Sequence, residues 1–353
     1  MKFYNREQEI KALYSSRVRA ETSAQMTFVV GRRRIGKTAL ILQSVKQARF
    51  VYFFVARKAE SLLCDEFCRQ IEMQLKVKIH GTFNDFSLLF AHILDLSKKQ
   101  HFTLVIDEFQ EFFHINHSIY SSMQGLWDIN KSESKLNLIC AGSIYSLMYK
   151  IFEDAKEPLY GRANHKIKLG PLGLSVQKKI LIDNHVPPVA DNILAFYMIT
   201  GGVPKYIELF VERKAFSLEE MLDVFFEQQS IFVNEGKDIL IEEFGKDYSI
   251  YFSILSLIAS SKTSRSEMES ILQKSIGGHL ERLEKNYGLI KTVKPILAKP
   301  GSRVQKYCIK DNFLNFWFRF CYKNLSALEI SNYQYVKNIV HDEYRTYSGL
   351  VLE

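Results

Sequence analysis

One short stretch of this chain restricts its possible folds more than any other. Residues 31–38 read Gly-Arg-Arg-Arg-Ile-Gly-Lys-Thr, which has the spacing G-x-x-x-x-G-K-T. Residues 26–30 are apolar and partly β-branched, as in a buried strand, and residues 38–43 favour a helix. Glycines let the backbone curl around phosphate oxygens, and a helix start directs free N–H groups and its positive dipole end at them. The stretch therefore predicts a phosphate-binding loop in a nucleotide site.

The residues of this loop have different predicted roles. Lys37 supplies a positive point charge for the phosphates, and Thr38 carries a hydroxyl suited to binding Mg²⁺. The three arginines at 32–34 are expected to face outward, toward a lid or a partner, with phosphate binding as the alternative. The predicted nucleotide contacts of the loop are Gly31, Arg32, Arg33, Arg34, Ile35, Gly36, Lys37, Thr38 and Ala39.

A second motif agrees with the first. Residues 102–108 form a hydrophobic run that ends in Asp107 and Glu108, and parallel α/β sheets place their ligand chemistry at strand ends. Asp107 is predicted to hold the Mg²⁺ shell, and Glu108 to orient and polarise the attacking water. The run at 50–56 has almost no polar face, as expected for a parallel sheet that is covered on both sides. The predicted fold class is therefore α/β, with a P-loop sheet core.

Two further side chains are candidates for catalysis. Ser143 follows the apolar run 136–142 and is predicted to contact the γ-phosphate or the water, with a plain helix N-cap as the alternative. Arg162 lies on a loop after Pro158, where a guanidinium could stabilise charge on a transferring phosphoryl group. A surface or salt-bridged arginine is the alternative for this residue.

Length and composition limit the remaining possibilities. A chain of 353 residues exceeds what one hydrophobic core usually supports, so several domains are expected. The predicted modules are a P-loop core, a helical lid, a winged helix-turn-helix and an incomplete aromatic segment, at residues 1–170, 171–245, 246–310 and 311–353. The early charges and the lack of any apolar run of about 18 residues predict no signal peptide, no membrane span and a cytoplasmic location.

The positive charge is concentrated in the predicted winged helix. Between Lys262 and Lys310 there are 11 basic and 4 acidic residues, a balance of +7 out of a net charge of +8. This excess predicts contacts with double-stranded DNA, whereas Glu281 and Glu284 would repel phosphate and favour a protein contact instead. The predicted phosphate contacts are Arg282, Lys285, Lys291, Lys294, Lys299, Arg303 and Lys306.

In their order, these motifs resemble those of the AAA+/STAND-related archaeal-type ATPases, also called the MNS clade. The resemblance begins at residues 3–9, Phe-Tyr-Asn-Arg-Glu-Gln-Glu, which are similar to the family's F-x-x-R-E-x-E box. It continues through the loop at 31–38, then Asp107-Glu108-Phe109-Gln110, Gly142-Ser143, Gly161-Arg162 and Gly201-Gly202-Val203-Pro204-Lys205-Tyr206.

The resemblance implies further roles. Phe3 and Arg6 would lie close to the adenine, and Ser143 would occupy the sensor-1 position. Residues 201–206 would belong to a lid over the nucleotide, although no arginine stands at the usual sensor-2 place. Arg162 would act as an arginine finger, within the chain or on a neighbouring subunit of a homo-oligomer.

The C-terminal segment departs from the family pattern. The family often carries a restriction-nuclease-like domain here, but the 43 residues after Lys310 are too few for it, and no nuclease activity is predicted. Its aromatic residues are too dense for an exposed surface and are expected to pack on the winged helix or on another subunit. They are Phe313, Phe316, Trp317, Phe318, Phe320 and Tyr322.

Two functional hypotheses follow. The first is Mg²⁺-dependent binding and hydrolysis of ATP, coupled through the lid to movement of the basic module, with DNA as a candidate partner. The second is a nucleotide-gated regulator that binds DNA or protein with little turnover. No guanine-reading N-K-x-D stretch is apparent, which favours ATP over GTP. A role as an antiphage or toxin-like effector is suggested by family context alone.

Overall fold

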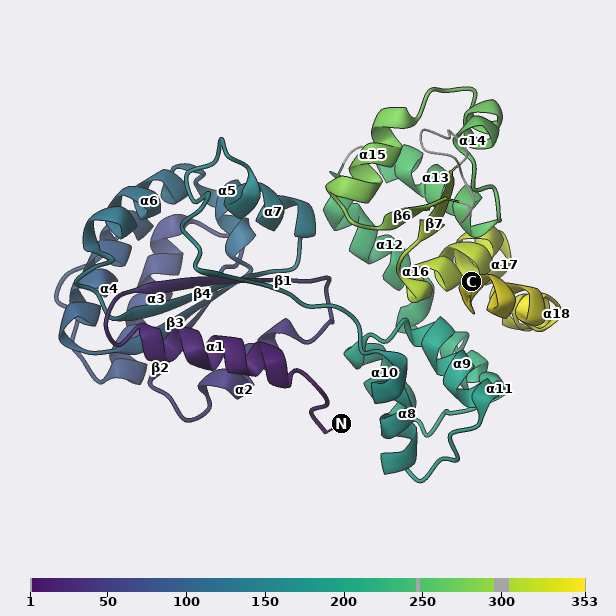
Figure 1. Ribbon diagram of the computed structural model, residues 1–353, viewed down its shortest axis with the longest axis horizontal. Helices are drawn as coiled ribbons and strands as arrows, with labels where there is room; N and C mark the ends of the chain where they lie inside the picture. The colour runs from purple at the N-terminus through teal and green to yellow at the C-terminus, as the bar shows by residue number, and fades with distance from the viewer. Residues whose placement is uncertain (1, 246–247, 295–304, 353) are drawn as a thin grey trace. The chain divides into compact units, whose positions relative to one another are not determined.

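The computed structural model describes residues 2–245, 248–294 and 305–352. The chain divides into two compact units (Figure 1). The first is Asn5–Gly170, and the second is Pro171–Glu353 together with Met1–Tyr4. The chain therefore passes between the units after Tyr4 and again after Gly170. The finer division of the second unit into a lid, a winged helix and an aromatic segment stays a prediction.

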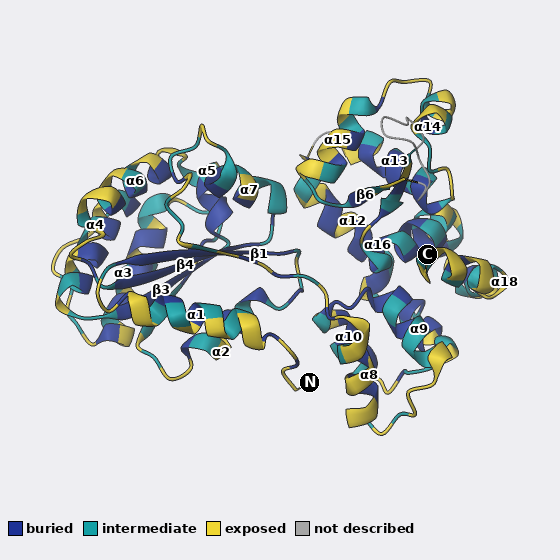
Figure 2. Ribbon diagram, viewed as in Figure 1, coloured by how far each residue is buried: buried dark blue, intermediate teal, exposed yellow. Residues whose placement is uncertain are grey.

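The first unit is built on a five-stranded parallel sheet with the strand order β2-β3-β4-β1-β5. Every residue of β1, β3 and β4 is buried (Figure 2). Such strands need helices on both faces, because neither face can be left to water. The predicted α/β fold with a P-loop sheet core is thereby confirmed. The strands are β1 (Gln25–Val30), β2 (Phe50–Phe54), β3 (Phe102–Asp107), β4 (Leu136–Gly142) and β5 (His165–Lys168).

Helices cover the sheet in two layers. Helices α1 and α2 lie against one face, and α3, α4, α6 and α7 cover the other, where the apolar core is largest (Figure 1). A short helical stretch, η1 followed by α5, connects β3 to α6. The bounds are α1 (Glu7–Arg19), α2 (Lys37–Val45), α3 (Glu60–Leu75), α4 (Phe86–Lys99), η1 (Phe109–Glu111), α5 (Phe112–Ile115), α6 (Ser118–Asn130) and α7 (Tyr145–Glu153).

A polar ladder crosses the buried sheet face under α1. Ser16 Oγ lies 3.1 Å from Thr27 Oγ1 of β1 and donates to Asn137 Oδ1 of β4 at 3.1 Å. Asn137 Nδ2 in turn donates to Thr103 Oγ1 of β3 at 3.1 Å. All four side chains are buried, and these hydrogen bonds satisfy them. The ladder joins the three strands whose carboxyl ends carry the predicted motifs.

The second unit begins with five helices, where a helical lid is predicted. Helix α10 starts at Pro204, a residue suited to a first helical turn, directly after Gly201 and Gly202 in left-handed conformations. A Cβ on Gly202 would lie 2.3 Å from Leu172 O, so glycine is required at that position. The helices are α8 (Leu174–Asp183), α9 (Ala190–Thr200), α10 (Pro204–Glu212), α11 (Leu218–Phe225) and α12 (Ile231–Phe244).

Three helices and an antiparallel hairpin follow, in the predicted order. Ser264 caps the second of these helices by accepting a hydrogen bond from the Glu267 backbone N–H. Residues 295–304, between the two strands, lie outside the described residues. The elements are α13 (Tyr248–Ala259), α14 (Arg265–Leu272), α15 (Gly277–Lys285), β6 (Ile290–Val293) and β7 (Lys306–Ile309).

The aromatic segment after Asp311 packs inside the second unit. Phe313 contacts the ring of Tyr206, and Phe316 contacts that of Phe225. Trp317 is 1% exposed and donates from Nε1 to Val233 O at 2.8 Å. The segment thus completes the core formed by α10 to α13. Its elements are α16 (Asn312–Phe316), η3 (Trp317–Cys321), η4 (Tyr322–Asn324), α17 (Leu325–Glu329) and α18 (Tyr333–Leu352).

None of the helices in the described ranges is both long enough and apolar enough to cross a bilayer.

Candidate nucleotide site

The glycine-rich loop connects the carboxyl end of β1 to the first residue of α2. Gly36 caps α2 in a left-handed conformation with φ 92°, which glycine adopts without strain. A Cβ on Gly31 would lie 2.7 Å from Leu169 O, so the loop can leave the sheet here only as glycine. Both glycines of the motif are therefore required by the backbone path.

Lys37 lies inside this loop. It is 6% exposed, and its Nζ donates to Gly31 O at 2.8 Å and to Arg32 O at 3.3 Å. The ammonium group is thus held above the loop and the first turn of α2, where backbone N–H groups collect. Among the other predicted contacts, Ile35 is buried, Arg32 and Arg34 are partly buried, and Arg33 and Ala39 are exposed.

Thr38 and Asp107 meet, although 69 residues separate them in the chain. Thr38 Oγ1 donates to Asp107 Oδ2 at 2.8 Å, while the Glu108 backbone N–H donates to Oδ1 at 3.0 Å. Asp107 is only 3% exposed, so its carboxylate is held in one position at the end of β3. A hydroxyl and a carboxylate this close offer two hard oxygen ligands of the kind that Mg²⁺ binds together with water and phosphate.

Tyr52 joins this pair and is absent from the sequence prediction. Its hydroxyl donates to Asp107 Oδ2 at 2.6 Å, from the neighbouring strand β2. Burial and the adjacent Asp107 carboxylate raise the pKa of Tyr52. The tyrosine therefore stays protonated and acts as a donor. Its only signal in the sequence is a polar atom in the otherwise apolar run 50–56.

Glu108 is held by two donors on one oxygen. Its Oε2 accepts from Ser143 Oγ at 2.7 Å and from Gln110 Nε2 at 2.5 Å. Its backbone has φ 53°, a left-handed conformation that turns the side chain away from the direction of β3. The N-cap residue of α7 is Ile144, which directly follows Ser143. The predicted contact of Ser143 with the γ-phosphate or the water stays a prediction.

Arg6 and Phe3 belong to different units. Arg6 is buried at the N-cap of α1, where its guanidinium donates to Gly170 O and pairs with Glu9 at 3.4 Å. Burial lowers the pKa of Arg6. The neighbouring Leu169 N–H donates to Val30 O, so Arg6 fastens the segment that lies beside the start of the loop. Phe3 is 39% exposed in the second unit, and its predicted adenine contact stays a prediction.

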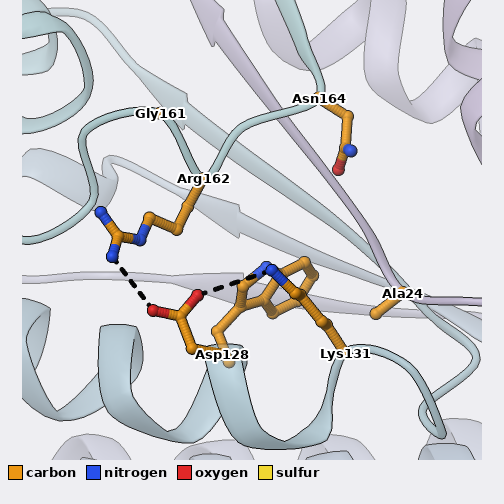
Figure 3. A pocket seen from close by; sticks show the side chains of 7 residues that line it. Ala24, Asp128, Lys131, Gly161, Arg162 and Asn164 are labelled. Carbon is orange, nitrogen blue, oxygen red and sulfur yellow. Dashed lines mark hydrogen bonds and ion pairs between the residues drawn. The ribbon is translucent and has the colours of Figure 1, made fainter.

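Arg162 lies near the amino ends of the strands, whereas the phosphate loop lies at their carboxyl ends. It donates to Asp128 of α6 at 3.0 Å and lines a cavity of about 440 Å³ together with Ala24 and Asn164, the residues before β1 and β5 (Figure 3). The six residues of β1 separate this end of the sheet from the loop by about 20 Å. The structure does not bring Arg162 to the phosphate loop of its own chain, so the salt-bridged alternative describes it. A role on a neighbouring subunit stays a prediction.

The residues predicted to contact DNA differ in their ion pairs and in their exposure. On α15, Lys285 pairs with Glu281 at 2.7 Å, which neutralises its charge, and Glu284 accepts from the Thr292 backbone N–H. Lys291, Lys294 and Lys306 are exposed on or beside the hairpin, as Arg282 is on α15. Lys299 and Arg303 lie outside the described residues.

In the region assigned to the lid, Lys205 pairs with Glu208 at 2.6 Å. This pair lies at the start of α10, on exposed and half-buried side chains. No role in phosphate sensing follows from it.

Comparisons with known proteins show which proteins and folds the chain is similar to. The chain is 27% identical to an uncharacterized protein of Methanocaldococcus jannaschii over 99% of its own length and 75% of that protein. Its fold is similar to that of a Walker-type ATPase of Pyrococcus abyssi, with a TM-score of 0.65 and 18% identity over 90% of this chain and 96% of that one. The ORC2 protein of Aeropyrum pernix, solved as ADPNP and ADP complexes, gives a TM-score of 0.59 and 16% identity over 94% and 96% of the two chains.

A family model describes more than half of the chain. Residues 3–210 match the ATPase domain that is found predominantly in Archaea. The match includes the loop, the β3 and β4 strand ends and the first helices of the second unit. The chain therefore belongs to this archaeal ATPase family and is a P-loop ATPase.

Proposed function

We propose that this protein hydrolyses ATP with Mg²⁺ at the carboxyl ends of β1, β3 and β4. The observation that carries the proposal is the 2.8 Å contact between Thr38 Oγ1 and Asp107 Oδ2. It places a hydroxyl and a carboxylate together at the edge where Lys37 and Glu108 also lie. Phosphate, metal ligands and a base are all needed in one place for phosphoryl transfer to water.

Each residue has a distinct role in this proposal. The loop amides and Lys37 bind the phosphates, because unsatisfied N–H groups and an ammonium charge both attract anions. Thr38 and Asp107 would hold Mg²⁺, which would neutralise part of the phosphate charge. Glu108 orients the water and accepts its proton, and Ser143 holds Glu108.

The binding step has a direct test. We expect Lys37→Ala to weaken ATP binding by about 10- to 100-fold, because a hydrogen bond to a charged group contributes about 1.5–3 kcal/mol. Titration calorimetry with ATP and Mg²⁺ measures this change. The matched control is Lys46→Ala, which removes an exposed lysine just after α2 and should leave the affinity unchanged. Absence of binding heat for the parent protein would refute the proposed function.

A second proposal concerns the basic module. The element order α13, α14, α15 and hairpin favours a winged helix, and its free charge is greater on the hairpin than on α15, where Glu281 neutralises Lys285. We therefore propose that the hairpin contacts the phosphates of duplex DNA. We also propose that the chain belongs to the MNS clade and that ATP hydrolysis is coupled through the lid to movement of the basic module.

Salt dependence distinguishes the hairpin from α15. We expect Lys306→Ala to reduce the slope of log affinity against log salt by about 1, as the loss of one phosphate contact should. Lys285→Ala, the matched control, should change the slope little because its charge is already paired. Fluorescence anisotropy with a labelled duplex measures both. Equal slopes for Lys306→Ala and the parent would contradict the hairpin contact.

The alternative function is a nucleotide-gated regulator with little turnover. Both functions use the same loop, so binding alone cannot separate them. Turnover measured with and without the duplex does so, because a regulator would bind ATP and DNA without appreciable hydrolysis.

A further inference from the structure

We propose that Gln110 is a positioning residue that aims the Glu108 carboxylate at the attacking water. The inference rests on the proposed hydrolysis and assigns a part of the same site. Gln110 would not touch ATP, Mg²⁺ or water. It would act only through the oxygen of Glu108 that it binds.

The contact is well defined by chemistry as well as by distance. Gln110 is fully buried in η1, and its Nε2 lies 2.5 Å from Glu108 Oε2. Only the amide nitrogen can face a carboxylate, because the reversed amide would bring two acceptors together. The orientation of the Gln110 side chain is therefore fixed by its partner.

The two donors come from different strands of the sheet. Gln110 follows β3, whereas Ser143 follows β4, and both donate to Oε2 of Glu108. Strands β3 and β4 are paired in parallel, so Gln110 and Ser143 belong to segments that leave the same end of the sheet. A carboxylate that accepts two hydrogen bonds on Oε2 has less freedom to rotate, so its Oε1 keeps a more constant direction. Oε1 is then the oxygen available to accept a proton from water.

The carbonyl oxygen of the Gln110 amide indicates that an apolar side chain would be more stable at this position. Its Oε1 is buried, and no hydrogen-bond partner for it is found among the described residues. A buried carbonyl without a partner lowers stability, and an apolar side chain of the same size would avoid this penalty. The donor bond to Glu108 is the compensating gain that the structure offers.

Gly142 provides the space for this amide. A Cβ on Gly142 would lie 2.3 Å from Gln110 Oε1 and 2.5 Å from Met148 Cγ. Glycine at the end of β4 therefore leaves the space in which the Gln110 amide lies when it binds Glu108. Any larger residue at this position would displace the amide.

The test compares turnover and binding in Gln110→Met, which keeps the length of the side chain and removes the donor. We expect kcat to fall by about 10- to 100-fold, as for a reacting group misplaced by about 1 Å, while ATP affinity stays within about twofold. In a Glu108→Gln background the same substitution should cause no further loss. A purely structural role would lower kcat in both backgrounds.

Two further variants separate loss of the Gln110 contact from a general loss of folding. Gln25→Met removes a buried amide at the opposite end of β1 and should leave kcat unchanged. Gly142→Ala keeps Gln110 but displaces it, and should reproduce the loss of kcat. If Gln110→Met fails to bind ATP, Gly142→Ala decides the question.

The outcomes separate this inference from the proposed function. Full turnover by Gln110→Met, or by a Gly142→Ala variant that binds ATP, overturns the positioning role and leaves the proposed hydrolysis intact. An additional loss in the Glu108→Gln background also overturns it. A parent protein that binds ATP without hydrolysing it overturns both.

Discussion

Replacing Glu108 by glutamine is expected to lower kcat by about 100- to 10,000-fold, the usual contribution of a positioned general base. Glutamine keeps the size of the side chain and can still bind Ser143, but its amide cannot accept a proton from water. Because the phosphate contacts come from the loop, ATP affinity should change little. Steady-state phosphate release and titration calorimetry, measured on the same preparation, give the two quantities.

A neighbouring carboxylate serves as the control for this substitution. Glu111 is buried in η1, the short helix that Glu108 precedes, and it pairs with Arg57 instead of the nucleotide-site residues. Glu111→Gln should therefore retain most of the parent kcat. If Glu108→Gln hydrolyses ATP as fast as the parent while binding it equally well, Glu108 is not the base.

Trp317→Ala is expected to destabilise the second unit by about 3–5 kcal/mol, as large-to-small substitutions of buried tryptophan do. The indole is almost fully buried, donates to Val233 O at 2.8 Å and packs edge-on against Phe252 at 6.2 Å. It fills the space left by Gly236, where a Cβ would lie 2.2 Å from the ring. Its removal leaves a cavity between α12, α13 and η3 that these elements cannot close without moving.

Thermal denaturation followed by circular dichroism measures this loss. A unit of this size loses about 2–4 °C of Tm per kcal/mol, so a decrease of roughly 6–20 °C is expected. The matched control is Tyr335→Ala on α18, where the aromatic ring is 53% exposed and its loss should change stability by less than about 0.5 kcal/mol. A decrease for Trp317→Ala no larger than that of the control would show that the aromatic segment is not part of this core.

Local patterns predicted the part of the site that lies along the chain. The glycines and Lys37 could be placed because their spacing is local, and Asp107 because it ends an apolar run. Tyr52 and Gln110 could not be found in this way. Tyr52 reaches Asp107 across the β2–β3 pair, in which Phe54 lies opposite Asp107, and this register is not visible in either run alone.

Arg162 illustrates a second kind of limit. The sequence indicates a loop arginine after Pro158, and such a residue fits a phosphoryl site by its chemistry. Its place is set by β5, which starts at His165 and pairs in parallel with β1, so the loop before it lies at the amino ends of the strands. The pairing of β5 with β1, which the loop sequence does not show, decided the outcome.

The buried ladder of Ser16, Thr27, Asn137 and Thr103 bears on how faithfully this molecule assembles. Strands that are apolar on both sides carry no alternation that would reject a slipped pairing, and a slip of one residue would turn Ser143 away from Glu108. The hydroxyl and amide groups of the ladder form their hydrogen bonds only in the native strand register. A shifted register would leave them buried without partners, which costs free energy. The relative positions of Asp107, Glu108 and Ser143 at the strand ends are thus fixed by buried polar side chains that lie elsewhere on the sheet and are not part of the nucleotide site.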